Sequence, residues 1–377
     1  MPRLIILLLL FGMSLFCVIQ AFTYHLWYVA IMVTEFPWIF ILIELLLLVG
    51  GFAPQRFQTM GNVIAIVSIA LFASPIIRAY TVSQHLPEEL VHAFGGTARN
   101  DLPKSPFQMS RMLTGIMAKT VSSQTLVYSN HPDGLALALD FYPAQVKGLR
   151  PCVIVVHGGS WAGGDNKQLP ELNSHLALKG YHVAAINYRL APKYKSPAPV
   201  ADIYAALHYL KTHAADLRID TQHFVLLGRS AGAQLVLVAA YAQQDPDIKG
   251  VINFYGPADM VWGYAQPANK WVFDSKKVME DFLNGTYAQV PAQYAASSAV
   301  ELVSPHTPPT LMIHGQNDVL VAYEHELRLG KKLQANGIPH YLLTLPWATH
   351  GCDYTLNGPS GQLSTYAVDY FLSQVAP

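Results

Sequence analysis

Cysteine and net charge are what this chain has least of. Its three cysteines, Cys17, Cys152 and Cys352, have spacings that fit neither a metal site nor a disulfide framework. Free buried thiols are the favoured prediction, and a bridge between Cys152 and Cys352 is the alternative. Basic and acidic residues number 24 each, the sequence pI is about 7.3 and no basic run occurs, so nothing indicates a nucleic-acid partner.

Apolar residues, in contrast, make up 52% of the chain, the mean hydropathy is +0.26, and the excess lies in residues 1–80. Residues 4–22 carry no charge and are long enough to cross a bilayer core; 37–53 form a second such stretch and 63–77 a shorter third. A cleaved signal peptide is the alternative for the first stretch, but no small-x-small cleavage site follows it. The pattern therefore predicts an all-helical membrane anchor of about three transmembrane helices over residues 1–80.

Few charges are available to orient this anchor. Arg3 and Arg56 flank the same side of the three predicted helices, and the first predicted loop, residues 25–36, has Glu35 as its one charged residue. Because basic residues favour the cytoplasmic side, we expect the N-terminus in the cytoplasm and the large C-terminal part on the extracytoplasmic side. Arg78, just beyond the third stretch, favours the opposite orientation.

Strand and helix patterns alternate after a Gly- and Pro-punctuated stretch, residues 81–122, which is predicted to be a linker or cap region. Two segments flank a turn signal and predict an antiparallel hairpin, and an irregular insert is expected after residue 255. The predicted strands are 124–128, 135–142, 152–156, 181–188, 224–227, 250–255, 310–314 and 340–345. Repeated β–α units of this kind predict an α/β fold with a doubly wound, mostly parallel sheet, whose ligand crevice lies at the carboxyl ends of the strands.

The strand at residues 224–227 runs into Gly228-Arg229-Ser230-Ala231-Gly232, and a helical segment follows directly. Strand, sharp turn and helix with a serine at the apex is the geometry of a nucleophile elbow. The turn holds the Ser230 hydroxyl above the sheet edge, near a helix N-terminus whose partial positive charge favours developing anions.

Three further motifs follow predicted strands and supply what such a serine needs. In His157-Gly158-Gly159-Ser160-Trp161 the N–H groups of Gly158 and Gly159, with that of Ala231, are predicted to bind an oxyanion. Asp318 and His350 each come shortly after a strand, and Ser230, Asp318, His350 is the chain order of an α/β-hydrolase triad. His350 would take the serine proton, and Asp318 would orient the imidazole.

Other residues compete for these roles. Asp202 begins a helix and precedes Ser230, and Asp353 follows His350 too closely to reach its far side easily, so both are disfavoured as the acid. His314 lies within the motif that carries Asp318 and is expected to be structural, and His157 is expected to orient its own loop.

From about residue 128 to the C-terminus the chain resembles the α/β-hydrolase superfamily, in particular the esterase/lipase branch that contains hormone-sensitive lipase and related carboxylesterases. The resemblance rests on His157-Gly158-Gly159-Ser160-Trp161, Tyr188-Arg189-Leu190-Ala191-Pro192, Asp202, Gly228-Arg229-Ser230-Ala231-Gly232, Phe254-Tyr255-Gly256-Pro257, residues 309–318 and His350-Gly351. It implies an α/β-hydrolase catalytic domain over residues 123–377, the triad and oxyanion donors above, and no metal or organic cofactor. Ser160 replaces a third glycine of many lipase relatives, which favours the H-G-G-x-W esterases, and Arg229 is a second departure.

The favoured interpretation is a membrane-anchored serine carboxylic-ester hydrolase that acts on a small-molecule or lipid ester through an acyl-enzyme. An amidase or peptidase on the same triad is one alternative, and a non-catalytic binding module on a hydrolase scaffold is another. Trp161, together with Trp262 and Tyr264 of the insert, is predicted to contact the substrate.

Overall fold

An eight-stranded mixed sheet organises residues 124–345 of the computed structural model, which describes residues 2–50, 56–96, 102–115 and 119–377. The strand order is β1-β2-β4-β3-β5-β6-β7-β8; β2 pairs antiparallel with β1 and β4, and the other neighbours pair parallel. The strands are β1 (Gln124–Asn130), β2 (Ala136–Tyr142), β3 (Arg150–Val156), β4 (His182–Ile186), β5 (Ile219–Arg229), β6 (Ile248–Phe254), β7 (Thr310–Gly315) and β8 (His340–Leu345). The predictions of a hairpin and a mostly parallel sheet are confirmed.

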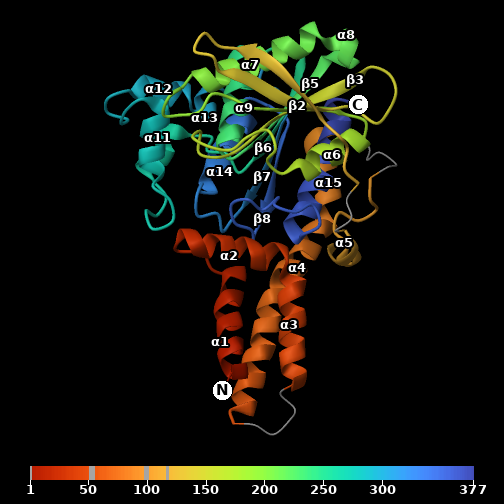
Figure 1. Cartoon of the computed structure of the whole chain (residues 1–377), viewed down its shortest axis with the longest axis vertical. Helices are drawn as coiled ribbons and strands as arrows, with labels where there is room; N and C mark the ends of the chain where they lie inside the picture. The colour runs from red at the N-terminus through yellow and green to blue at the C-terminus, as the bar shows by residue number, and fades with distance from the viewer. Residues whose placement is uncertain (1, 51–55, 97–101, 116–118) are drawn as a thin grey trace.

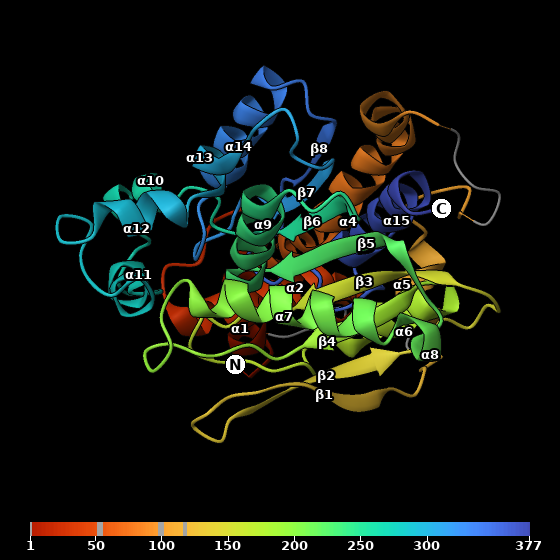
Figure 2. The ribbon, with the colours of Figure 1, turned by 90° about the horizontal axis from the view of Figure 1, so that it is seen from above.

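Helices cover both faces of this sheet, which explains why its central strands are continuously apolar. In register, Ile154 of β3 pairs with Leu226 of β5, and both are fully buried. One face packs against α7 (Ala198–Thr212), α9 (Ala231–Gln243) and α14 (Glu324–Ala335), with the short α8 (Ala214–Leu217) nearby. The other packs against α6 (Pro170–Leu178), α15 (Pro359–Val375) and the upper part of α4 (Gln58–Phe94), and Figure 2 shows α15 beside α4.

The insert between β6 and β7 is helical, whereas the sequence pattern predicted it to be irregular. Two of its helices begin at capping aspartates: Asp259 accepts from the N–H of Trp262, and Asp274 accepts from the N–H of Lys277. These helices are too short for a clear apolar period, so their caps are the better signal. They are α10 (Met260–Ala265), α11 (Ser275–Leu283), α12 (Pro291–Ala296) and α13 (Ala299–Leu302).

The N-terminal helices form a stalk below the sheet (Figure 1). The stalk contains α1 (Pro2–Ser14), which ends in the 3-10 turn η1 (Leu15–Cys17), together with α3 (Pro37–Val49) and the lower part of α4. Between stalk and sheet, α2 (Tyr24–Glu35) lies crosswise, where the sequence predicted a loop. The short α5 (Met109–Thr114) packs beside α15, since the Gln108 N–H donates to the side chain of Gln362.

Only α4 is, among the described helices, long and apolar enough by itself to cross a membrane. A second span results if α2 and α3, which meet at 82°, are counted together. Two predicted boundaries differ from the helix ends in the structure. The helix that begins the predicted stretch 4–22 ends at Ser14, and the predicted end of the anchor at residue 80 falls inside α4. With 13 residues each, α1 and α3 are about 20 Å long, which is shorter than a bilayer core of about 30 Å. Three spans therefore stay a prediction.

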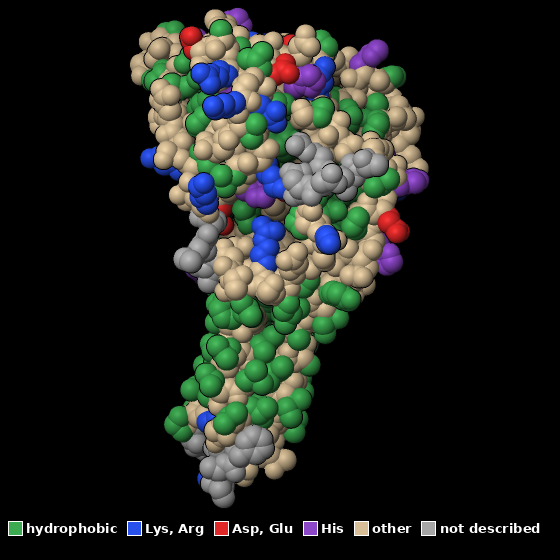
Figure 3. Space-filling model, turned by 90° about the vertical axis from the view of Figure 1, so that its right-hand side faces the viewer, with side chains coloured by type: hydrophobic (Ala, Val, Ile, Leu, Met, Phe, Trp, Pro, Cys, Tyr) green, Lys and Arg blue, Asp and Glu red, His purple; other side chains and the backbone are tan. Residues whose placement is uncertain are grey.

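Hydrophobic side chains cover the visible face of the stalk between its tip and the sheet-containing domain, where charged groups become frequent (Figure 3). Exposed examples are Ile5, Leu9, Leu46, Val49, Val63, Ile66 and Ile77. At the tip, Arg3 donates to the Leu47 carbonyl at 2.9 Å and to the Asn62 side chain at 2.5 Å, which ties α1 to α3 and α4.

Candidate active site

Ser230 lies at the turn between β5 and α9, with its backbone in the left-handed region at a φ of 53°. Two glycines permit the tight turn. A Cβ on Gly228 would lie 2.4 Å from the carbonyl oxygen of Gly232, and a Cβ on Gly232 would lie 2.3 Å from that of Val156. A non-glycine residue is strained at this φ, so the surrounding strand and helix hold the serine in a conformation that presents its hydroxyl.

Three side chains from separate loops form a chain of hydrogen bonds at the carboxyl edge of the sheet. The Ser230 hydroxyl lies 2.9 Å from Nε2 of His350, and Nδ1 of His350 lies 2.7 Å from Oδ2 of Asp318. His350 is 5% exposed and so is Asp318, so both lie largely out of water. With Nδ1 donating to the carboxylate, Nε2 is free to accept the serine proton.

Asp318 is held as an anion by several donors. Its Oδ1 accepts from the N–H groups of Leu320 and Val321 at 2.8 and 2.9 Å. Burial alone would raise the pKa of Asp318, but the His350 and His314 side chains outweigh it and hold this pKa well below its ordinary value. A permanently ionised carboxylate can stabilise an imidazolium on His350.

His314, expected to be structural, lies behind Asp318 as a fourth member of this chain. Its Nε2 is 3.1 Å from Oδ2 of Asp318, and its Nδ1 is 3.2 Å from Oε1 of Glu326. Burial alone would lower the pKa of His314, but hydrogen bonds to the two carboxylates raise it to about 10. The contact with Glu326 joins β7 to α14, and no local pattern in the sequence indicates it.

Replacing His314 with glutamine is expected to lower the melting temperature, most strongly at low pH. A pKa raised from 6.5 to about 10 means that the protonated histidine stabilises the fold fully below pH 6.5, and that this stabilisation is lost as the pH rises through 10. We expect a loss of about 3 kcal/mol at pH 6, or about 4 °C in melting temperature, that shrinks by pH 10. Thermal unfolding at pH 6, 8 and 10 checks this, with the exposed His208→Gln as control; an equal loss at every pH contradicts it.

The predicted oxyanion loop follows β3, and the structure distinguishes among its three predicted donors. The N–H of Gly158 donates to the side-chain oxygen of Gln168 at 2.8 Å and is therefore occupied. The N–H groups of Gly159 and Ala231 have no acceptor among the described residues. Gln168, ten residues downstream, is a partner that the motif did not reveal.

The two competing aspartates are both engaged elsewhere. Asp202 pairs with Arg189, whose Nε lies 2.9 Å from Oδ1. Asp353 pairs with Arg229, whose Nε lies 2.5 Å from Oδ2, and the Tyr255 hydroxyl donates to the other carboxylate oxygen. This second ion pair is almost fully buried and gives Arg229, unexplained by the sequence, a structural role beside Ser230.

The N-terminal part of the chain reaches the same site through Trp27 of α2. Its indole Nε1–H donates to the carbonyl oxygen of His350 at 2.9 Å, across 323 residues of sequence. The sequence placed Trp27 in a loop between two membrane helices, and no short-range signal links it to His350.

Replacing Trp27 with phenylalanine is expected to lower kcat for a water-soluble ester by about 3–10-fold, because one hydrogen bond that holds the His350 backbone is lost. KM should change little, since Trp27 does not line the cavity described next. Steady-state kinetics measure both constants. Trp271→Phe is the control, because the Trp271 side chain is 81% exposed. Equal kinetics for both variants contradict the role of Trp27.

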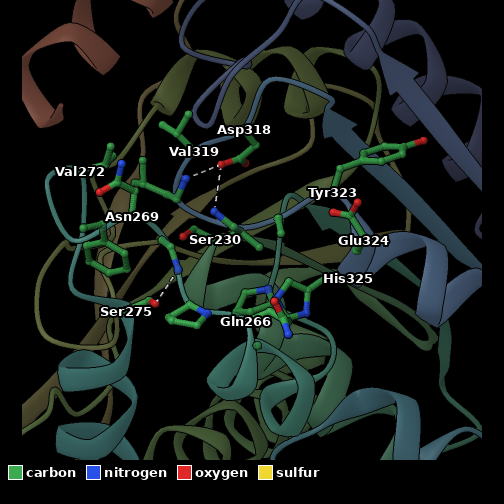
Figure 4. A pocket seen from close by; sticks show the side chains of 18 of the residues that line it. Ser230, Gln266, Asn269, Val272, Ser275, Asp318, Val319, Tyr323, Glu324 and His325 are labelled. Atoms are coloured by element: carbon green, nitrogen blue, oxygen red, sulfur yellow. Dashed lines mark hydrogen bonds between the residues drawn. The ribbon is translucent and has the colours of Figure 1, made fainter. Parts of the chain in front are cut away.

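A cavity of about 690 Å³ lies over Ser230 (Figure 4). Trp161 lines it, stacked on Phe282 with ring centres 4.5 Å apart. Trp262 and Tyr264, predicted to contact substrate, are not among its described lining residues: Trp262 packs edge-on against His325, and the Tyr264 hydroxyl donates to Glu280. The insert contributes other residues instead, namely Gln266, Pro267, Ala268, Asn269, Val272, Phe273, Ser275 and Met279.

Comparisons with known proteins agree with this architecture. A family model described as BD-FAE matches residues 139–333. The probable carboxylic ester hydrolase LipM of Mycobacterium tuberculosis (strain ATCC 25618 / H37Rv) is 26% identical over 93% of this chain and 86% of its own length. The esterase LipC of the same organism is 26% identical over 60% of this chain, which spans 58% of LipC. The LipM match therefore extends well into the stalk.

Among solved structures, one described as bacterial heroin esterase superposes with a TM-score of 0.59 at 20% sequence identity. The superposition covers 71% of this chain and 88% of that one. At this identity the likeness concerns the fold.

Proposed function

Because the chain belongs to the BD-FAE family of α/β-hydrolase esterases and lipases, we propose that it is a membrane-anchored carboxylic ester hydrolase whose nucleophile is Ser230. Carboxylic ester hydrolysis is the activity that its curated relatives support. The observation that carries the assignment of the nucleophile is the chain of hydrogen bonds from Ser230 through His350 to Asp318.

In the proposed reaction Ser230 Oγ attacks the ester carbonyl carbon while Nε2 of His350 takes the hydroxyl proton. Asp318 stabilises the imidazolium that forms. The tetrahedral intermediate collapses, His350 gives its proton to the leaving alkoxide, and an acyl-enzyme remains on Ser230. Water, activated by His350 in the same way, then releases the acid and restores the serine.

The developing oxyanion is assigned to the N–H groups of Gly159 and Ala231. Loss of one such donor costs about 3–4 kcal/mol of transition-state stabilisation. Gly158, whose N–H is bound by Gln168, then shapes the loop and does not itself donate.

Membrane anchoring is proposed from the stalk. The length and apolar composition of α4, together with the exposed hydrophobic side chains around it, support insertion. Arg3, near the stalk tip, and Arg56 favour a cytoplasmic tip and an extracytoplasmic catalytic domain.

Labelling of the full-length protein with a fluorophosphonate, followed by mapping of the modified peptide, tests the nucleophile. We expect a single adduct on Ser230, together with turnover of p-nitrophenyl butyrate and much slower turnover of the matching p-nitroanilide. A folded protein without adduct or turnover contradicts the proposal, and faster anilide cleavage would make the enzyme an amidase.

A further inference from the structure

The cavity over Ser230 is walled in part by the N-terminal segment. Gln20, Ala21 and Phe22, in the turn between η1 and α2, line it from one side. Phe22 is 57% exposed, so this wall lies at the entrance. Asn269 and Val272 of the insert, labelled in Figure 4, line it as well. The entrance is therefore bordered by the segment between η1 and α2 and by the loop that joins α10 to α11.

Hydrogen bonds join the residues around this entrance to α2. The Tyr24 N–H donates to the carbonyl oxygen of Trp271 at 3.3 Å, which joins the start of α2 to the insert loop. Trp27 of the same helix contacts the His350 backbone. Figure 1 shows α2 just above the stalk. The two contacts place the cavity and the carboxyl edge of the sheet beside α2.

Exposed aromatic side chains gather at this same level. We call them the aromatic belt, which consists of Phe22, Tyr24, Tyr28, Trp271 and Tyr354. The Tyr24 and Tyr28 rings lie 5.2 Å apart, and Tyr354 packs against Phe36 at the end of α2. Tryptophan and tyrosine are enriched at the headgroup level of membranes, where their rings contact apolar chains and their polar atoms contact water.

The apolar surface below the belt has the length of a bilayer core. Residues 58–77 of α4 span about 30 Å, which matches the hydrocarbon thickness of a membrane. With the stalk inserted, the belt lies at the interface and the cavity entrance opens at the headgroups. Phe22, Val272, Phe273 and Val319 contribute apolar side chains to the cavity lining, beside polar residues such as Gln266 and Asn269.

We propose that the enzyme takes its substrate directly from the bilayer, as the ester of an amphiphile whose hydrocarbon chain enters between Phe22 and the insert loop. This inference rests on the proposed ester hydrolysis and membrane anchoring. An ester dissolved in water must first reach the membrane interface before it can enter the cavity. An ester held in the bilayer is already concentrated at that interface.

Activity in vesicles tests this substrate route. The full-length protein in phosphatidylcholine vesicles receives either p-nitrophenyl palmitate within the bilayer or p-nitrophenyl acetate in the buffer; the two share a leaving group. Trp271→Glu places a charge in the belt without touching the cavity lining. Leu149→Glu is the matched control, because Leu149 is 67% exposed and precedes β3 at the opposite edge of the sheet.

We expect Trp271→Glu to lower palmitate turnover about tenfold and to leave acetate turnover within about twofold, with an unchanged melting temperature. Leu149→Glu should change neither activity. Hydrolysis of acetate without hydrolysis of bilayer palmitate by the wild type, or equal palmitate turnover in both variants, overturns the inference and leaves ester hydrolysis intact. Hydrolysis of neither ester, without a fluorophosphonate adduct on Ser230, overturns the proposed function itself.

Discussion

Replacing Ser230 with alanine is expected to lower kcat for p-nitrophenyl butyrate by about 10⁴–10⁶-fold, because no other group can form the acyl-enzyme. KM should stay close to the wild-type value, since the cavity around the serine is unchanged. A small residual rate is expected from the oxyanion donors and the bound geometry alone. Steady-state kinetics of the purified protein in detergent measure both constants.

The exposed Ser123→Ala is the control for this experiment, because it makes the same change far from the cavity. Both variants should melt at the wild-type temperature. A Ser230→Ala protein that retains more than about a tenth of wild-type kcat would mean that another residue is the nucleophile.

Replacing Arg229 with methionine is expected to destabilise the protein by about 3–5 kcal/mol, because the buried Asp353 carboxylate loses its counter-charge. Arg229 lies next to Ser230 and Asp353 lies three positions after His350, so their ion pair joins the loops that carry Ser230 and His350. Tyr255 extends this contact, since its ring lies 4.5 Å from that of His350. We therefore expect kcat to fall together with the melting temperature.

Lys277→Met is the matched control, because Lys277 also pairs with an aspartate, Asp281, but the two side chains are 63% and 40% exposed. Its loss should stay below about 1 kcal/mol. The double variant Arg229→Met/Asp353→Asn should recover part of the stability, since asparagine removes the unpaired charge and still accepts from Tyr255. Thermal unfolding measures all three, and equal losses for Arg229→Met and Lys277→Met would refute a stabilising role for the buried pair.

The sequence predicts the sheet well because its signals there are local. Continuous apolar runs such as residues 152–156 are typical of strands buried on both faces, and the β–α alternation predicts that most strands pair in parallel. The candidate triad is predictable for the same reason. Each of Ser230, Asp318 and His350 follows a strand, so the fold brings them to one edge.

The remainder of the site is not predictable because it depends on contacts between distant segments. Trp27 meets His350 across 323 residues, and the Glu35 carboxylate accepts from the Ser360 hydroxyl across 325. Both contacts are made by residues of the apolar N-terminal region. Its composition indicates membrane helices and does not indicate that part of it packs against the sheet-containing domain. Phe22 at the cavity entrance belongs to the same region. Only the arrangement of the chain in space reveals that the N-terminal part contributes to the candidate site.

The length of α4 bears on how often the enzyme meets its substrate. One helix of 37 residues, about 55 Å, runs from the stalk tip to the edge strand β8, where Glu89 accepts from the Tyr341 hydroxyl. A flexible linker would let Ser230 sample a large volume of solution, and the effective concentration of any membrane ester would fall accordingly. With α4 in the membrane as proposed, the helix instead keeps Ser230 within a thin layer at constant height, so that encounters depend on lateral diffusion in two dimensions. The turnover rate should then follow the mole fraction of the ester in the membrane, and not its amount per volume of buffer.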